Sequence, residues 1–179
     1  SGVPAAQRNW VNDHTVYTHG FGFVGAYGNK RTPEGDPVFF SGGLDGASAA
    51  FDSYEPRVYF GDESPTYSVV GAPAGAAPRE FDYPDDAGAG GQKSVTYTGT
   101  GGVAMGSFLG KLAYAANYRE PKLILSDQVN EASRMLDHRS PKERVERVAP
   151  WLTLDGNSYP AVVDGRIQWI VDGYTTTDR

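Results

Sequence analysis

The sequence has no cysteine among its 179 residues. Disulfide bonds, zinc sites built on thiolates and thiol nucleophiles are therefore excluded for this chain. It also lacks a long apolar run, because Lys111 interrupts the longest candidate and a membrane-spanning helix needs roughly 18 apolar residues. Residues 1–5 are neither basic nor apolar enough for a signal peptide. We therefore expect a soluble segment, and any export or membrane signal of a parent protein would lie outside it.

Positive charge is scarce in the first part of the chain. Residues 1–106 carry 6 basic and 12 acidic groups, whereas residues 107–179 carry 10 of each, so the net charge of −6 belongs to the first part. Binding nucleic acid requires clustered basic charge, and we expect no nucleic-acid partner. The basic residues that do cluster alternate with acidic ones and indicate a solvated helix face: Arg134, Arg139, Lys142, Arg144 and Arg147.

The order of predicted elements indicates an α+β fold. Short runs of β-branched and aromatic residues predict strands in the first half, at residues 14–17, 38–40, 57–60, 67–70 and 94–98. Helical periodicity and capping signals then predict a block of three helices, at residues 107–117, from 126 or 127 onward, and at 141–149, with a short strand or extended link at 123–125. Asp164-Gly165 predicts a C-terminal β-hairpin. We expect a loose lead-in at 1–9 and a single domain at 10–177.

Two glycine-rich stretches are candidates for binding a ligand. Gly99, Gly101 and Ala104 fit a dinucleotide-binding motif loosely, but the preceding segment is polar and alternating, unlike the buried first strand of such a fold. We predict instead a turn that lets helix 107–117 pack closely on a sheet, with Phe108, Leu109, Leu112, Ala113 and Ala116 on one face, and no cofactor or dinucleotide. On a strand, Gly20 and Gly22 would share a bare face that admits another backbone or a ligand. The candidate ligand-binding residues are therefore His19, Gly20, Gly22, Gly101 and Gly102.

Histidines and carboxylates are the candidates for catalysis and for metal binding. His14 and His19 are five residues apart, which places them on opposite faces of a straight strand, so a shared metal would need a bulge or loop and we predict none. His138 is expected near a helix C-terminus, where the dipole favours it. An acidic stretch lacks the spacing of a calcium loop, and its default interpretation is a solvated loop: Glu80, Asp82, Asp85 and Asp86. The alternative hypothesis is catalytic and pairs His19 with a carboxylate of this acidic stretch, with Asp82 as the first candidate.

Seven motifs occur in order along the chain: Tyr17-Thr-His-Gly20, Tyr59-Phe-Gly61, Glu80-Phe-Asp-Tyr-Pro84, Gly101-Gly-Val103, Ser133-Arg134, Arg144-Val-Glu-Arg-Val-Ala-Pro-Trp-Leu-Thr153 and Gly165-Arg-Ile-Gln-Trp-Ile-Val-Asp-Gly-Tyr174. Over residues 10–177 the chain thereby resembles uncharacterised protein family 0182. The members of this family are large bacterial proteins with several N-terminal membrane helices and a long extracytoplasmic region. The resemblance implies that this chain is a soluble segment of a cell membrane protein on the extracytoplasmic face. It assigns no activity and no catalytic residue.

Two hypotheses for function follow. In the first, the chain is a non-catalytic extracytoplasmic module that serves assembly, binding or an envelope function, with the remainder of the parent protein and possible envelope components as partners. In the alternative, it is an envelope-facing hydrolase that uses His19 and an acidic-loop carboxylate. An enzyme predicts a concave pocket with convergent polar groups, whereas a module predicts a broad, partly apolar patch where the rest of the parent docks.

Overall fold

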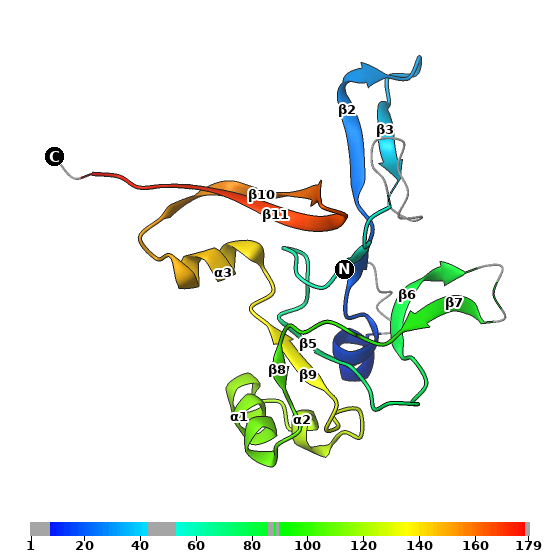
Figure 1. The fold of residues 1–179 in the computed structure, drawn as a ribbon, viewed down its shortest axis with the longest axis vertical. Helices are drawn as coiled ribbons and strands as arrows, with labels where there is room; N and C mark the ends of the chain where they lie inside the picture. Colours follow the sequence, from blue (N-terminus) through cyan, green and yellow to red (C-terminus); the bar gives the residue numbers. More distant parts are fainter. Residues whose placement is uncertain (1–7, 43–52, 86–87, 89, 178–179) are drawn as a thin grey trace. The chain divides into compact units, whose positions relative to one another are not determined.

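The computed structural model describes residues 8–42, 53–85, 88 and 90–177 (Figure 1). The chain divides into two compact units, each made of two chain segments. Unit 1 comprises Ser1–Thr18 and Glu63–Arg139, and unit 2 comprises His19–Asp62 and Ser140–Arg179. The strands form several small antiparallel sheets and the helices are short and separate, which confirms the α+β class. The single domain expected over residues 10–177 stays a prediction.

Unit 1 is built on a three-stranded antiparallel sheet in the order β5-β9-β8. Its strands are β5 (Tyr67–Val70), β9 (Arg134–Asp137) and β8 (Val103–Ala104). Met135 on the central strand is paired with Val69 on one side and Val103 on the other. Both Met135 and its neighbour Leu136 are fully buried, so the central strand is covered on both faces. The hydrophobic core of unit 1 lies around this sheet.

The second predicted helix, from residue 126 or 127, is wrong. Residues 127–132 form turns, and the chain then enters strand β9. A strand buried on both faces carries consecutive apolar residues, and these lack the alternation that identifies a strand at the surface. With Val129 and Ala132 upstream, the same residues mimic a helical period. Residues 123–125, expected to be extended, instead belong to the one-turn helix α2 (Lys122–Leu125).

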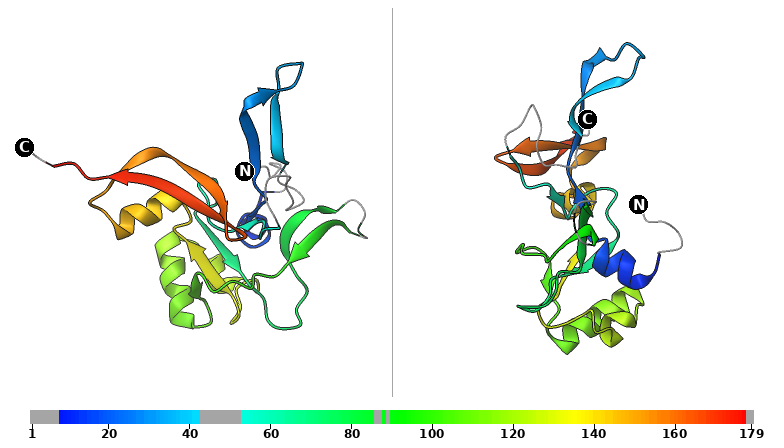
Figure 2. Two further views of the ribbon diagram at one scale, coloured as in Figure 1. Left: turned by 45° about the horizontal axis from the view of Figure 1, so that its top comes forward. Right: turned by 90° about the vertical axis from the view of Figure 1, so that its right-hand side faces the viewer.

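Helix α1 (Phe108–Tyr118) confirms the helix predicted at residues 107–117, directly after the glycine-rich stretch. Ser107 caps it, since its Oγ accepts a hydrogen bond from the Gly110 amide at 3.0 Å. Both views in Figure 2 show α1 next to the three-stranded sheet of unit 1. The side that packs on the core carries Ala115, Tyr114 and Tyr118. The apolar face identified in the sequence therefore points away from this core.

The N-terminal part of unit 1 is helical rather than extended. Residues 14–17 were expected to form a strand, but Asn12–Val16 is a π-helical turn, η2. Tertiary contacts favour the helix, because Trp10 Nε1 donates a hydrogen bond to the Tyr67 hydroxyl at 2.9 Å and the His14 ring stacks on the Tyr67 ring. Both contacts are made with Tyr67, and a helix keeps Trp10 and His14 about 6 Å apart along its axis, whereas a strand would separate them by about 13 Å.

A hairpin of unit 1 replaces the expected acidic loop. It pairs β6 (Glu80–Asp85) with β7 (Gly91–Val95), and β7 accounts for the beginning of the strand predicted at 94–98. Glu80 and Asp82 are buried, so the interpretation as a solvated loop is wrong for these two residues. Asp86 lies outside the described residues.

Unit 2 consists mainly of two-stranded antiparallel ribbons and one helix. The ribbons pair β1 (Gly20–Phe21) with β4 (Arg57–Val58), β2 (Val24–Arg31) with β3 (Pro37–Gly42), and β10 (Thr153–Val163) with β11 (Arg166–Tyr174). The predicted C-terminal hairpin is confirmed, with Val163 paired to Arg166. Asp164 and Gly165 both have positive φ, as the two-residue turn requires.

Helix α3 (Pro141–Val148) begins with proline at its first turn, as predicted. Ser140 does not cap it; its Oγ donates to Asp62 Oδ1 at 2.9 Å instead. The prediction that the basic residues form a solvated helix face is wrong for two of them, because Arg134 lies on strand β9 and Arg139 is buried. In the described part of the chain, no helix is long and apolar enough to cross a membrane.

Candidate functional site

The two residues of the catalytic alternative belong to different units. His19 precedes β1 in unit 2, and its ring lies 4.6 Å from the ring of Tyr59, centroid to centroid. Asp82 lies on β6 in unit 1 and is only 3% exposed. The fold of unit 2 therefore positions His19 and the fold of unit 1 positions Asp82, and neither unit contains both residues. Catalysis by this pair stays a prediction.

Gly20 and Gly22 have distinct structural roles in unit 2. A Cβ on Gly20 would lie 3.9 Å from Val58 Cβ, which is ordinary contact with the neighbouring strand β4. Gly22 has a φ of +81°, which favours glycine, and its amide donates to the Pro56 carbonyl at 2.7 Å. The left-handed φ thus accounts for the glycine at position 22. Ligand binding there stays a prediction.

Gly101 and Gly102 form part of a cradle for an arginine. Arg134 Nε donates to the Gly101 carbonyl at 2.7 Å, and its Nη2 donates to the carbonyls of Thr100 and Gly102 at 2.8 and 2.7 Å. A phosphate-binding loop presents N–H groups to its ligand, whereas this loop turns three carbonyl oxygens toward a cation of the same chain. A Cβ on Gly102 would lie 2.5 Å from the Met135 carbonyl oxygen. The stretch therefore brings its own backbone close to that of β9. The expected packing of helix 107–117 through Phe108, Leu109 and Leu112 differs from this, because those side chains are exposed.

His14 is held inside an aromatic cluster of unit 1. Its ring stacks on Tyr67 with the centroids 4.0 Å apart, and its Nδ1–H donates to the Tyr67 carbonyl at 2.9 Å. Burial lowers the pKa of His14 below its ordinary 6.5, which favours the neutral ring. Among the described residues there is no group of three or more His, Asp or Glu side chains placed to hold a metal ion. His14 thus has a packing role in unit 1.

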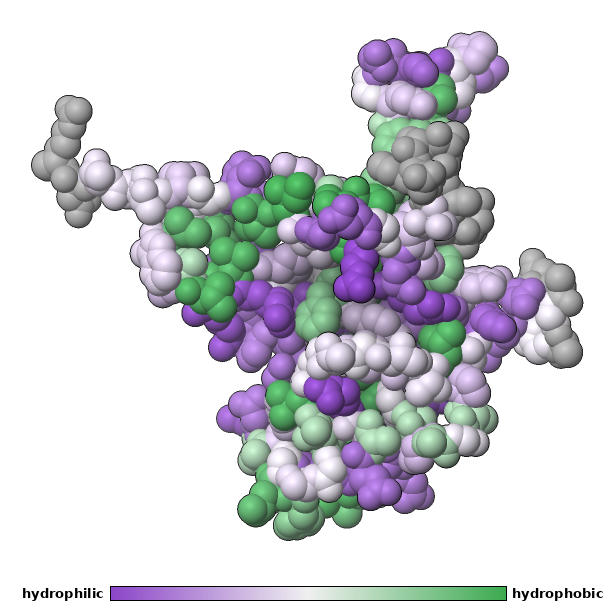
Figure 3. Space-filling view, viewed as in Figure 1, coloured by the Kyte–Doolittle hydropathy of each residue, from purple (hydrophilic) through white to green (hydrophobic). Residues whose placement is uncertain are grey.

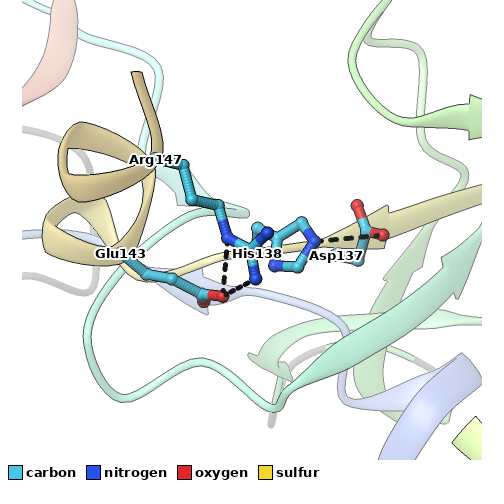
Figure 4. A network of polar contacts seen from close by, with 4 residues as sticks. All are labelled: Asp137, His138, Glu143 and Arg147. Atoms are coloured by element: carbon cyan, nitrogen blue, oxygen red, sulfur yellow. Dashed lines mark hydrogen bonds and ion pairs between the residues drawn. The ribbon is translucent and has the colours of Figure 1, made fainter. Parts of the chain in front are cut away.

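His138 lies after strand β9 and not at a helix C-terminus, so its expected position is wrong. Its φ of 47° is in the left-handed region, and its Nε2 is 3.9 Å from Asp137 Oδ2 (Figure 4). Figure 4 also shows Glu143 and Arg147 of helix α3, whose carboxylate and guanidinium are 3.1 Å apart at the i,i+4 spacing. That second pair is a solvated helix pair of the predicted kind.

Sequence reasoning missed a buried polar network in unit 1. Glu80 is 0% exposed, and its Oε1 accepts hydrogen bonds from the amides of Gly71 and Tyr97, each at 2.9 Å. Its Oε2 accepts from the Thr18 hydroxyl at 3.0 Å.

Arg139 extends this network to the end of unit 1. It is 2% exposed and donates to the Ser68 hydroxyl at 2.6 Å and to the Thr18 carbonyl. Thr18 and Arg139 are the last residues of the two segments of unit 1, so the network ties these segment ends together. No local pattern reveals it, because its members are separated by up to 121 residues.

An outward apolar face is the most distinctive surface feature of unit 1. Phe108, Leu109 and Leu112 of α1 are 64%, 75% and 44% exposed, and Leu125 of α2 is 78% exposed. Helices α1 and α2 pack on each other. Figure 3 shows apolar side chains at the surface over α1. We call the three residues of α1 the α1 face.

The sequence is similar to known proteins over its whole length. The sequence model of the uncharacterised protein family UPF0182 matches residues 1–179. A UPF0182 protein of Tropheryma whipplei is 55% identical over 172 residues, which is 96% of this chain. The chain belongs to this family.

Further UPF0182 relatives match along almost the whole chain. A protein of Paenarthrobacter aurescens is 52% identical over 178 residues and one of Bifidobacterium longum is 53% identical over 174 residues, covering 98% and 96% of this chain. The chain spans 18%, 18% and 16% of the length of these three relatives. No solved structure matches it. The UPF0182 description is that of an uncharacterised family and assigns no activity.

Proposed function

We propose that this chain is an extracytoplasmic module of a multi-pass bacterial membrane protein, and that it serves assembly, binding or an envelope function. Its partners are the remainder of the parent protein and possible envelope components. The observation that carries the proposal is the α1 face, since an exposed cluster of large apolar side chains marks an interaction surface. A pairing of His19 with Asp82 for hydrolysis is the alternative. The cradle around Arg134 supports a packing role for residues 99–106 in place of dinucleotide binding.

The placement outside the cytoplasm is tested by thiol labelling of the full-length protein in intact cells. The chain has no cysteine, so Asn157→Cys in unit 2 and Lys93→Cys in unit 1 each introduce the sole thiol of this segment, once any cysteines elsewhere are removed. Both positions are exposed. Asn157 lies at an irregularity inside strand β10, where the register with β11 shifts between Leu154 and Ser158. A membrane-impermeant maleimide should label both variants in intact cells.

The matched measurement is labelling of the same variants after lysis. Equal labelling before and after lysis supports the outside placement. Labelling that appears only after lysis, for both variants, places the segment in the cytoplasm and contradicts the proposal. One thiol is placed in each unit because a single position could be covered by another part of the full-length protein and then fail to react on either side of the membrane.

A further inference from the structure

Helix α1 is apolar on two adjoining sides, since Phe108 and Ala115 are seven residues apart and lie about 20° from each other around the helix axis. One side packs into the core of unit 1 through Ala115, Tyr114 and Tyr118, and the other is the α1 face. Lys111 is the sole charged residue within the helix, and its Nζ donates to the Val129 carbonyl at 2.6 Å. A helix at the surface of a finished protein normally turns a polar stripe to water, whereas a helix that is hydrophobic all round is buried. The composition of α1 is therefore that of an interior helix.

We infer that in the full-length protein the α1 face packs against a segment of the same polypeptide that lies outside these 179 residues. The inference rests on the proposed function only in treating the chain as part of a longer protein. The length of the relatives supports it, because they are about five to six times as long as the matched region. A large amount of chain is thus available to cover one helix face.

The size of the face favours a covalently linked partner over a second copy of the chain. The three side chains, of which about two-fifths to three-quarters is exposed, offer on the order of 300 Å² of surface. Stable association of separate proteins buries about 800 Å² on each partner. A segment of the same polypeptide needs less area, because the chain linkage holds it at a high effective concentration. The α1 face is of the size that suits such an intramolecular contact.

The composition of α1 disfavours a lipid surface as the occupant. Helices that lie in a membrane interface pair an apolar face with a polar face rich in Lys and Arg. Helix α1 has a single charged residue, Lys111, and its amine is bound to a carbonyl.

The test places a photo-crosslinking residue in the face of the full-length protein in its native membrane. Leu109 is replaced by benzoylphenylalanine, and the same replacement at Lys93, an exposed position on β7, is the matched control. After irradiation, the crosslinked peptides are identified by mass spectrometry. We expect position 109 to crosslink within one polypeptide to a peptide outside the 179 residues, and the control to give at most about a tenth of that yield.

Each other product would overturn the inference. A covalent dimer identifies a second copy as the occupant, and a lipid adduct identifies the membrane. A crosslink to His19–Asp62 or Ser140–Arg179 would show that unit 2 covers the face. Absence of any crosslink, together with a Leu109→Cys thiol that reacts as fast as Lys93→Cys, would show that the face stays open. The result is independent of the labelling experiment, because an intramolecular crosslink can form on either side of the membrane.

Discussion

Glu80 carries a carboxylate into the interior of unit 1, where two backbone amides and the Thr18 hydroxyl donate hydrogen bonds to it. Glu80→Leu keeps a similar volume but leaves the amides of Gly71 and Tyr97 buried without this acceptor. Each buried donor without a partner costs about 1–3 kcal/mol. We therefore expect Glu80→Leu to lower the free energy of unfolding by about 3 kcal/mol or more, measured by urea denaturation.

Two variants separate hydrogen bonding from a general loss of a glutamate. Glu80→Gln retains one oxygen for both amides, and its NH2 group can donate to the Thr18 hydroxyl, so it should destabilise less than Glu80→Leu. Glu131→Leu, at an exposed position of the same unit, should change the free energy of unfolding by no more than about 0.5 kcal/mol. If Glu80→Leu were as mild as Glu131→Leu, the network would not stabilise unit 1.

The same network shows why the sequence alone did not indicate which polar residues are buried. The hydroxyl of Thr18 lies 62 residues along the chain from Glu80, and Ser68 lies 71 residues from Arg139. The acidic stretch at 80–86 and the basic run at 134–147 are typical of solvated surface on composition. Burial of Glu80 and Arg139 depends on partners that only the tertiary fold supplies, and no local pattern contains that information.

Single elements with strong local signals were predicted well. Helices α1 and α3 and the turn at Asp164-Gly165 depend on capping residues, proline position and positive φ, all of which lie within a few residues. Strand β9 and the helical turn η2 were missed because their conformations depend on distant partners, β5 and Tyr67. The candidate sites followed the same division: close packing at the glycines of residues 99–106 was expected, whereas their contact with β9 and the exposure of the apolar side chains of α1 were not.

The loop before β8 gives a test of the packing role at the scale of one element. Gly102 has a φ of +80°, and an added Cβ would lie 2.5 Å from the Met135 carbonyl oxygen and 2.6 Å from Leu136 Cδ2. Gly102→Ala therefore combines left-handed backbone strain with a clash against the backbone of β9. We expect the free energy of unfolding to fall by about 2–4 kcal/mol. Thermal denaturation followed by circular dichroism measures the change.

Gly28→Ala is the matched control for this substitution. Gly28 lies on the exposed strand β2, its φ is negative, and an added Cβ would have no atom within 4 Å. Replacing glycine at such a position is neutral or slightly stabilising, within about 1 kcal/mol. Equal effects of Gly102→Ala and Gly28→Ala would contradict a close approach of the loop to β9.

The buried apolar core of the described chain is distributed unevenly between the two units. Ten of the eleven buried apolar residues belong to unit 1, where they surround the sheet β5-β9-β8, and Tyr54 belongs to unit 2. Unit 2 instead relies on two-stranded ribbons, which are marginally stable on their own in water. At the scale of the whole molecule, we expect the free energy of opening to be higher in unit 1 than in unit 2.

Native-state hydrogen exchange of the 179-residue chain measures this difference directly. The amides of β5 and β9 should exchange more slowly than those of the ribbons β2–β3 and β10–β11, by about a hundredfold or more, because exchange from a core strand requires unfolding of the unit whereas a ribbon opens locally. Amides that flank the chain crossings at Thr18 and Arg139 should follow unit 1, since the buried network with Glu80 holds both residues. Equal protection of the strands in both units would contradict the prediction and would show that residues 10–177 open as the single cooperative domain expected from the sequence. Slow exchange in unit 2 alone would mean that its ribbons are stabilised by contacts other than the buried apolar residues of the described chain.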